Sequence, residues 1–232
     1  MPSSVQNVVL IRHDVSIANV DPMVYRTMPD HVIPLVSLDS DRVKRAGSII
    51  AGLGFELSNT CAWSSPYVRC LQTQQGVLSA AYATQIDAVR RRESFLLREQ
   101  EFGDWDSLTD AEAEVQLPRA FAKRKLLTDN QGKFYFRYPN GESRADVVQR
   151  VISFIGKIIR SDYSNHILFL HGVTQRAFRM AWLNLDVDWF EDEPNPKNAS
   201  VLWIRRDSDG VGWIEQELPD GECRSHEWRK PV

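Results

Sequence analysis

The sequence predicts an α/β protein, a three-layer α/β/α fold with a mostly parallel central sheet. Two short apolar runs, residues 8–11 and 167–170, are rich in β-forming residues and too short for helices, as expected of buried strands. Segments with helical periodicity lie between them, and this alternation is typical of a layered parallel sheet. With 232 residues the chain can bury a sizeable core, and we expect one domain over residues 1–232.

Two of the helices have recognisable beginnings and ends. Ser40 is a capping residue before an apolar stripe at helical spacing, and Gly54 follows that stripe as an expected stop. Ser143 precedes a second stripe that continues to Ile159. Both segments are therefore predicted to be helices with one buried face.

Two further helices are expected near polar residues. Ser65 followed by Pro66 is the pattern of a capping serine before a proline at the first helical position, so we expect a helix from Tyr67 onward. Another helix should follow the strand at 167–170, from about residue 174 to residue 182.

The remaining segments, 104–139 and the residues after 200, do not follow the alternation of strands and helices. Residues 104–139 interrupt the alternation, and we interpret them as an inserted cap or lid. Residues 200–205 and 211–217 are expected to be late strands near the edge of the sheet, joined by a turn at 207–210.

The charge balance argues against bulk binding to nucleic acid or to an anionic membrane. Lys and Arg total 28 against 31 Asp and Glu, a formal charge of −3, whereas such partners select a basic surface. A small polyanionic substrate would instead have to be attracted by a local cluster of Arg.

The cysteines and the N-terminus indicate a cytoplasmic protein. Cys61, Cys70 and Cys223 are widely spaced and form no CxxC pair, so we expect reduced thiols. Only four consecutive apolar residues occur before the first charge, which fits neither a signal peptide nor a membrane span.

Polar residues follow the predicted strands directly. Arg12 and His13 come after the first strand, His171 and Gly172 come after the strand at 167–170, and Arg69 lies early in a predicted helix. In open α/β sheets ligands bind beyond the carboxyl ends of the strands. Two imidazoles and two guanidinium groups at that edge would suit a tetrahedral dianion such as phosphate.

Five segments resemble, in order, the motifs of the histidine phosphatase superfamily, the phosphoglycerate-mutase-like proteins. They are residues 10–19 (LIRHDVSIAN), 65–73 (SPYVRCLQT), 97–105 (LREQEFGDW), 137–143 (RYPNGES) with Asp146, and 171–174 (HGVT). Residues 29–31 and 195–198 also fit the broad phosphatase-like branch of that superfamily.

The resemblance implies a metal-independent phosphatase that needs no cofactor and acts on a small phosphorylated substrate. His13 would attack phosphorus and form a phosphohistidine, while Glu99 would protonate the leaving group and later activate water. Glu101, two positions along, is the rival for the acid role, and the family spacing favours Glu99.

The other matched positions would bind the phosphoryl group or the rest of the substrate. Arg12, Arg69 and His171 would neutralise the phosphoryl oxygens, so that no metal ion is required. Ser16 and Asn19 could hydrogen-bond the phosphoryl group or the organic part. Gly172 suits a close approach of the backbone to a ligand.

Asp14 departs from the family pattern, in which glycine usually follows the nucleophile. A carboxylate beside a phosphate site disfavours anion binding unless it points elsewhere. Three interpretations follow: Asp14 points away harmlessly, it favours a less anionic or cationic substrate, or it impairs the site. We prefer the first two jointly.

Two other functions stay open at this point. One is phosphoglycerate-mutase-like transfer, which requires a lid that excludes water. The other is a catalytically weak protein that binds a phosphorylated ligand or a protein partner because of Asp14. The oligomeric state is open too.

Several other residues are given more ordinary roles. His31 is either structural or at the rim of the substrate site, and His166 and His226 are expected on the surface. Residues 90–92, three consecutive Arg, are interpreted as a solvated cluster.

Zinc is not expected, because no two His are spaced at i, i+4 and no Cys pair accompanies them. Tyr25 and Trp105 fall in segments expected to line the rim of the pocket.

Overall fold

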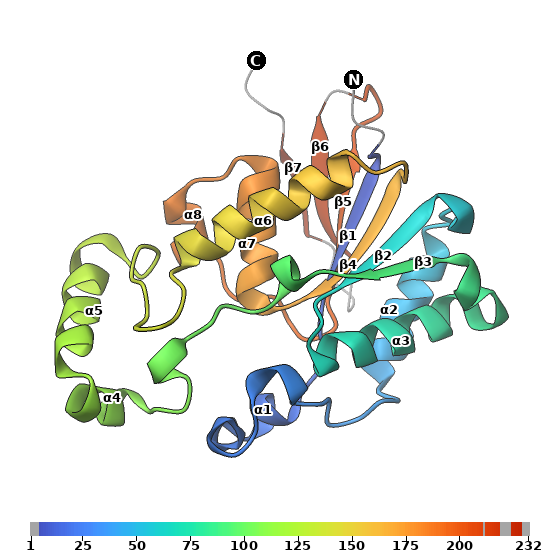
Figure 1. Cartoon of the computed structure of the whole chain (residues 1–232). Helices are drawn as coiled ribbons and strands as arrows, with labels where there is room; N and C mark the ends of the chain where they lie inside the picture. The colour runs from blue at the N-terminus through green and yellow to red at the C-terminus, as the bar shows by residue number, and fades with distance from the viewer. Residues whose placement is uncertain (1–4, 211, 219–223, 229–232) are drawn as a thin grey trace.

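A seven-stranded sheet forms the centre of the computed structural model, with strand order β3-β2-β4-β1-β5-β6-β7 (Figure 1). The structure describes residues 5–210, 212–218 and 224–228. The strands are β1 (Asn7–Arg12), β2 (Thr60–Ser64), β3 (Arg90–Glu93), β4 (Asn165–Leu170), β5 (Val201–Arg206), β6 (Trp213–Leu218) and β7 (Arg224–Trp228).

Most strands run in one direction, as predicted. β3, β2, β4 and β1 are parallel neighbours, whereas the pairs β1–β5, β5–β6 and β6–β7 are antiparallel. β6 therefore runs with the parallel set, and only β5 and β7 run against it. The two late strands expected from the sequence are β5 and β6, whereas β7, which forms the edge of the sheet, was not expected.

Helices cover both faces of the sheet (Figure 1). The helices are α1 (Ile17–Val20), α2 (Asp41–Gly52), α3 (Val68–Tyr82), α4 (Asp110–Gln116), α5 (Pro118–Gln131), α6 (Arg144–Ile159), α7 (Gly172–Leu183) and α8 (Val187–Asp192). α6 and α7 pack against one face, and α2 and α3 pack against the other. This is the three-layer arrangement that the sequence predicts.

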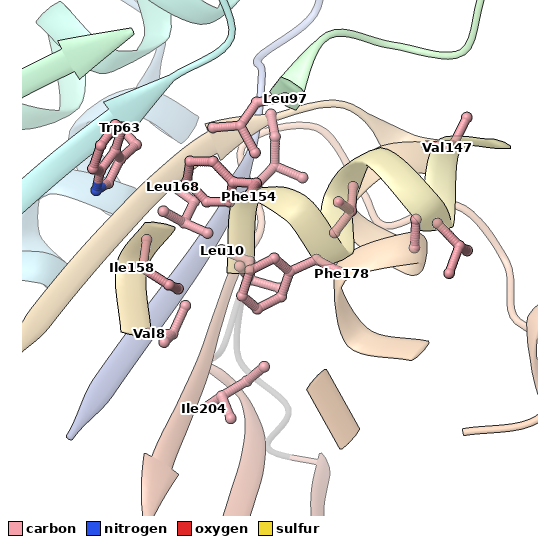
Figure 2. Packing of buried hydrophobic residues seen from close by; sticks show 14 of the residues in the cluster. Val8, Leu10, Trp63, Leu97, Val147, Phe154, Ile158, Leu168, Phe178 and Ile204 are labelled. Carbon is pink, nitrogen blue, oxygen red and sulfur yellow. The ribbon is translucent and has the colours of Figure 1, made fainter. Parts of the chain in front are cut away.

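The alternation of side chains along β1 builds the two halves of the core. Val8 and Leu10 join the cluster under α6 and α7, where Phe154 and Phe178 are fully buried (Figure 2). Val9 and Ile11 point to the other face and pack with α2 and α3. Successive residues of a strand face opposite sides, so a central strand covered on both faces is apolar throughout.

Two predicted helix starts are confirmed. The Ser40 hydroxyl accepts the Val43 N–H at 3.1 Å at the start of α2, and Gly54 follows that helix with φ +64°. Ser143 caps α6, and its own N–H donates to the Asp146 carboxylate at 2.7 Å in a capping box.

The predicted capping role of Ser65 is wrong. α3 begins at Val68 with Tyr67 as its N-cap, and no side chain caps it. The Ser65 hydroxyl instead lies 2.9 Å from His171 Nε2. The helix that follows His171 is α7, which begins at Gly172 and so starts two residues earlier than expected.

The expectation that His166 lies on the surface is also wrong. It belongs to β4, between β2 and β1, and it is fully buried. Trp63 Nε1 donates to His166 Nδ1 at 3.3 Å, and burial lowers the pKa of His166 to about 4. β4 lies between two other strands and is covered by helices on both faces. Even a polar residue near the start of such a strand is therefore buried.

The remaining minor expectations have mixed outcomes. Residues 90–92 are exposed, as predicted, and they form the start of the edge strand β3. Cys61 and Cys70 are buried free cysteines. Cys223 and the side chain of His226 lie outside what the structure describes. No helix among the described residues is both long and apolar enough to cross a membrane.

Residues 103–142, here called the α4–α5 segment, lie apart from the sheet (Figure 1). The segment has a small core of its own, formed by Trp105, Ala113 and Phe136. It includes residues 104–139, which the sequence analysis interpreted as an inserted cap or lid, and that interpretation stays a prediction.

The two ends of the α4–α5 segment are joined in a narrow neck. The Glu142 N–H donates to the Glu101 carbonyl at 2.8 Å. Gly103 has φ +55°, and a Cβ there would lie 2.1 Å from the Pro139 carbonyl oxygen. Glycine is needed at position 103 for its positive φ, and also because the segments at 103 and 139 approach so closely that a side chain would not fit.

Candidate active site

The sheet register brings the predicted site residues to one edge. Arg12 pairs with Leu170 at the ends of β1 and β4, so the next residues, His13 and His171, emerge side by side. The His13 N–H donates to the Leu170 carbonyl at 2.9 Å, and the two imidazole centroids lie 5.2 Å apart. Ser65, just beyond β2, joins them beside His171.

His13 is buried and held in one tautomer. Its ring Nδ1 lies 2.7 Å from the carbonyl oxygen of Asp14. A carbonyl oxygen can only accept, so Nδ1 carries the proton and Nε2 keeps its lone pair. Burial first, and then the charges of Arg69 and Arg12, lower the pKa of His13 to about 3, although the bond to Asp14 opposes them. His13 is therefore a neutral imidazole at neutral pH.

Two guanidinium groups accompany the histidines. Arg12 Nη1 donates to the Pro196 carbonyl at 2.6 Å, and its Nε is buried without a partner among the described residues. Arg69 is 3% exposed and forms a two-pronged ion pair with the Asp30 carboxylate at 2.8 and 3.2 Å. An unpartnered buried donor such as Arg12 Nε marks a position for an anion.

Burial acts to lower the pKa of both guanidinium groups, but the final pKa is lowered for Arg12 and raised for Arg69. It lowers the pKa of Arg12, despite the opposing charge of Glu99. It also acts to lower the pKa of Arg69, but the Asp30 carboxylate outweighs it, so that this pKa lies above its ordinary value. Both side chains are cations at any physiological pH.

His171 is fully buried at the N-cap of α7. Its Nε2 lies 2.9 Å from the Ser65 hydroxyl and 3.4 Å from Cys70 Sγ, and its ring meets the Tyr67 ring edge-on at 5.0 Å. Burial and the Arg69 charge lower its pKa well below the ordinary value. The second histidine is therefore neutral too, and can act as a hydrogen-bonding group.

Glu99 lies beside His171, although it comes from the loop that follows β3. Its carboxylate accepts the N–H groups of Val173 and Thr174, both at 3.3 Å, in the first turn of α7. The N–H groups at the start of a helix stabilise negative charge. Glu99 and His171 thus meet at one helix terminus, and the Glu99 charge reaches Arg12.

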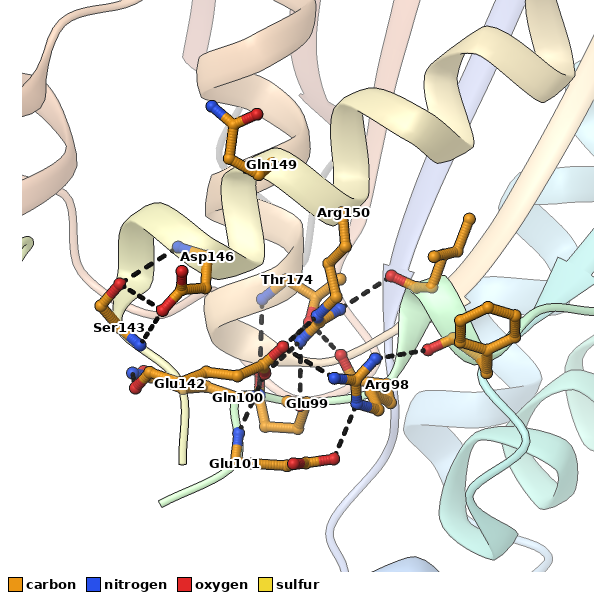
Figure 3. A network of polar contacts seen from close by, with 12 residues as sticks. Arg98, Glu99, Gln100, Glu101, Glu142, Ser143, Asp146, Gln149, Arg150 and Thr174 are labelled. Carbon is orange, nitrogen blue, oxygen red and sulfur yellow. Dashed lines mark hydrogen bonds and ion pairs between the residues drawn. The ribbon is translucent and has the colours of Figure 1, made fainter. Parts of the chain in front are cut away.

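A buried ion network holds the loop that carries Glu99 (Figure 3). The Glu142 carboxylate binds Arg98 at 2.8 Å and Arg150 at 2.9 Å. Arg150 also donates to the Glu99 carbonyl at 3.0 Å, and the Gln100 side chain donates to the Glu142 carbonyl at 2.9 Å. The sequence analysis missed the roles of Glu142 and Arg150, although residue 142 lies within a matched motif.

Glu101, the rival for the acid role, has a different environment. It is exposed, and its carboxylate pairs with Arg98 at 2.8 Å. The structure therefore brings Glu99 to the histidines by way of α7 and binds the Glu101 carboxylate to Arg98. The assignment of Glu99 as the acid stays a prediction.

Asp14 is buried, and its carboxylate is bound away from the histidines. It accepts from the Ser40 hydroxyl and from Arg42 Nε, the latter at 2.6 Å, at the start of α2. The Asp14 N–H donates to the Thr73 hydroxyl at 3.0 Å. The residue that departs from the family pattern thus ties the loop after β1 to the neighbouring helices α2 and α3.

The three predicted substrate-binding residues have protein partners. The Ser16 hydroxyl and N–H both donate to Asn19 Oδ1, at 3.2 and 3.1 Å, in a capping box for α1. Gly172 does allow a close approach, but the neighbour is Asn195, whose side chain would lie 2.9 Å from a Cβ there. Their contact with substrate stays a prediction.

The rim of the site includes other residues named in the sequence analysis. His31 is exposed and its ring lies 6.4 Å from that of Tyr67, so it stands at the edge of the site. Asn198 Nδ2 donates to the His13 carbonyl at 3.0 Å. The sequence contained no signal for the pairing of Asp30 with Arg69, because two loops far apart in the chain form it.

A cavity of about 310 Å³ lies between the 3-10 helix η1 (Pro22–Arg26) and the α4–α5 segment. Tyr25 and Trp105 line it, as the sequence analysis expected for rim residues. Phe102, three residues after Glu99 in the chain, lines it too.

Among the described residues, no group of three or more His, Cys, Asp or Glu is arranged to hold a metal ion. The cationic groups at this site are therefore the two Arg side chains.

Comparison with known proteins identifies the family. The family model described as "Histidine phosphatase superfamily (branch 1)" matches residues 8–217. A phosphoglycerate mutase-like protein of Arabidopsis thaliana, AT74, is 29% identical over 84% of this chain. The chain spans 63% of the length of that relative.

Two other matches extend the comparison. The broad-range acid phosphatase DET1 of Saccharomyces cerevisiae is 31% identical over 48% of this chain and 33% of its own length. A mycobacterial glucosyl-3-phosphoglycerate phosphatase has a similar fold, with a TM-score of 0.64, 21% identity, and coverage of 86% of this chain and 89% of its own. The last likeness concerns the fold alone.

Proposed function

The chain belongs to the histidine phosphatase superfamily, and we propose that it hydrolyses phosphomonoesters through a phosphohistidine on His13, with Glu99 as the proton donor. The observation that carries this proposal is the state of His13. Its Nδ1 is bound to a carbonyl oxygen, its Nε2 has a free lone pair, and burial lowers its pKa to about 3. A buried neutral imidazole next to two guanidinium groups is prepared to attack a phosphate ester.

In the first step a bond forms between His13 Nε2 and phosphorus as the ester P–O bond breaks. The leaving oxygen takes the proton of Glu99 and departs as an alcohol. Arg12 and Arg69 neutralise the phosphoryl oxygens while the charge is redistributed, and the neutral His171 donates a hydrogen bond. Arg12 Nε, which has no partner among the described residues, is available for this role.

In the second step water attacks phosphorus and the N–P bond breaks. The Glu99 carboxylate takes a proton from the water, so the acid of the first step is the base of the second. Inorganic phosphate leaves, and His13 returns to its neutral state. The two guanidinium groups supply the positive charge throughout, which is why we propose a metal-independent reaction.

The position of Asp14 favours an enzyme over a disabled binding protein. Its carboxylate is bound to Ser40 and Arg42, so it is not directed at the phosphate position. Phosphoglycerate-mutase-like transfer would share the first step and differ in the acceptor of the second. The similarity to a yeast protein named as an acid phosphatase supports hydrolysis. The cytoplasmic location expected from the sequence stays a prediction.

The test is a phosphate-release assay over a panel of phosphomonoesters with EDTA present. We expect wild type to release phosphate and His13→Ala to lose at least about a thousand-fold in kcat/KM, because the nucleophile is gone. His166→Gln is the matched control, because it alters a buried histidine of the same sheet that lies outside the site.

Circular dichroism should show that His13→Ala keeps the wild-type fold. Release that survives this substitution would contradict the mechanism. Release that requires a divalent ion would contradict metal independence. Conversion of one phosphoglycerate isomer into another without net release would favour the mutase alternative.

A further inference from the structure

We propose that the cavity between η1 and the α4–α5 segment binds the organic part of the substrate and selects a single aromatic ring that carries a cationic N–H donor, which Asp106 accepts. This inference rests on the proposed phosphatase activity and names its substrate class. It follows from the size, the walls and the charge of the cavity.

The size of the cavity suits one ring system. Its volume of about 310 Å³ is at the lower end of the range for small-molecule sites. Arg26 of η1 crosses to the α4–α5 segment, where it donates to Glu112 at 2.7 Å and to the Ser107 carbonyl at 3.2 Å. These contacts join the two sides of the cavity, so an acyl chain or an oligosaccharide would exceed it.

Aromatic side chains form much of the wall. Tyr138 meets Phe102 at 5.0 Å and Trp105 at 5.6 Å, both edge-on. Such packing fixes the orientation of each ring. Aromatic rings bind well to flat ring systems and to cations, since their faces carry partial negative charge.

The cavity lining carries one uncompensated negative charge. Its charged residues are Asp106, Asp110 and Arg124, two acids against one base. Arg124 pairs with Asp110 at 2.8 Å and lies over the Trp105 ring at 5.1 Å. Asp106 forms no side-chain hydrogen bond or ion pair with any residue in the described part of the chain.

The surroundings of Asp106 favour a cationic partner. Asp106 is an exposed residue. Partial desolvation and the negative charges of Asp30 and Glu101 together raise the pKa of its carboxyl to about 6, against the opposing charge of Arg69. A carboxylate with other negative charges nearby and no cationic partner attracts a donor that brings positive charge. A substrate with a second anionic group would meet repulsion from the same residue.

The chain connects the cavity to the proposed site on two sides. Phe102, which lines the cavity, follows Glu99 by three positions. On the other side η1 comes directly after α1, and Asn198 Nδ2 donates both to Asn19 of α1 at 3.1 Å and to the His13 carbonyl at 3.0 Å. Burial raises the pKa of Tyr25 to about 12, so this lining residue is a neutral phenol. A phosphate held by the guanidinium groups would direct its ester oxygen and ring toward this cavity.

The experiment compares benzyl phosphates that carry aminomethyl, hydrogen or carboxylate at the para position, with EDTA present. We expect kcat/KM in wild type to fall in that order, by about ten-fold between the aminomethyl and the unsubstituted ester, the value of a charge-assisted hydrogen bond. Benzyl phosphate should exceed ethyl phosphate by about ten-fold as well, because only the former fills the aromatic walls.

Asp106→Asn should reduce the preference for the aminomethyl ester to within about two-fold of the unsubstituted one. The control is Asp129→Asn, which makes the same change at an exposed position on α5 outside the cavity and should keep the wild-type ratio. A ratio that does not change in Asp106→Asn would overturn the proposal, and so would equal rates for the three esters.

Binding to His13→Ala separates the two proposals. Calorimetry with the same three esters should show the same order in Kd, and Asp106→Asn in that background should remove it. If wild type releases no phosphate but this order is seen, the cavity proposal stands and the phosphatase proposal fails. If release is normal and no order is seen in rates or in Kd, the cavity proposal fails alone.

Discussion

The sheet edge and the α4–α5 segment contribute different things to this molecule. At the sheet edge, His13 and His171 follow two paired strands, and each is almost completely buried. The α4–α5 segment has a separate small core and joins the rest of the chain through a neck at Gly103. The comparison teaches that the proposed chemistry lies on the central sheet, whereas the proposed specificity lies on a segment that packs around a core of its own.

The largest expected difference between the two regions is in turnover. Arg12→Ala should lower kcat/KM by roughly 100-fold or more for every phosphomonoester, because a donor to the phosphoryl oxygens is lost. Arg119→Ala, the same change at an exposed position on α5, should stay within about two-fold.

Phosphate-release kinetics on both variants measure this difference. The expected contrast between the two regions would be contradicted if Arg12→Ala lowered kcat/KM strongly for one substrate and hardly at all for another. That result would mean that Arg12 recognises the organic part of the substrate.

The second difference is in acid stability. His13 has a pKa lowered to about 3 by burial and by Arg69 and Arg12, whereas the unfolded value is near 6.5. The unfolded state therefore binds the proton more readily, and stability falls as pH drops from 6.5 toward 3. Between pH 7 and pH 5 this one group lowers the free energy of unfolding by about 2 kcal/mol.

Urea unfolding at the two pH values measures this effect. His13→Ala should lose about 2 kcal/mol less than wild type between pH 7 and pH 5, whatever its stability at pH 7. Equal losses would mean that His13 is charged in the folded protein, which contradicts the assigned nucleophile. Residues 103–142 contain no His, so acid should act first on the sheet edge.

The smallest expected effect concerns Asp14, which ties the loop after β1 to α2. Asp14→Gly removes contacts with Ser40 and Arg42 and should lower the free energy of unfolding by about 1 kcal/mol. Turnover should change by less than about three-fold, because the carboxylate is bound away from the histidines. A rise of ten-fold or more would show instead that Asp14 suppresses phosphate binding.

The sequence predicted the sheet edge well because local patterns determine it. Apolar runs locate β1 and β4, and the parallel pairing of these strands then brings His13 and His171 together. The caps at Ser40 and Ser143 were predictable for the same reason, since a cap is a contact within one turn. Five motifs in order identified the family, which the family match confirms.

The sequence could not predict features that depend on distant contacts. His166 was expected on the surface because the central place of β4 in the sheet is not visible in a local window. Ser65 looked like a cap, yet its hydroxyl lies beside His171, more than a hundred positions away. The ion network on Glu142 and the place of Asp106 in the cavity lining likewise depend on contacts between distant parts of the chain.

The most direct test of the central claim is to trap the phosphorylated enzyme. Wild type would be mixed with excess substrate, quenched in alkali within the first turnovers, and analysed by intact and peptide mass spectrometry. We expect one added phosphoryl group on the peptide that contains His13, stable to alkali, lost in acid, and absent from His13→Ala. Turnover with no phosphorylated enzyme, or a phosphoryl group on another residue, would contradict the account.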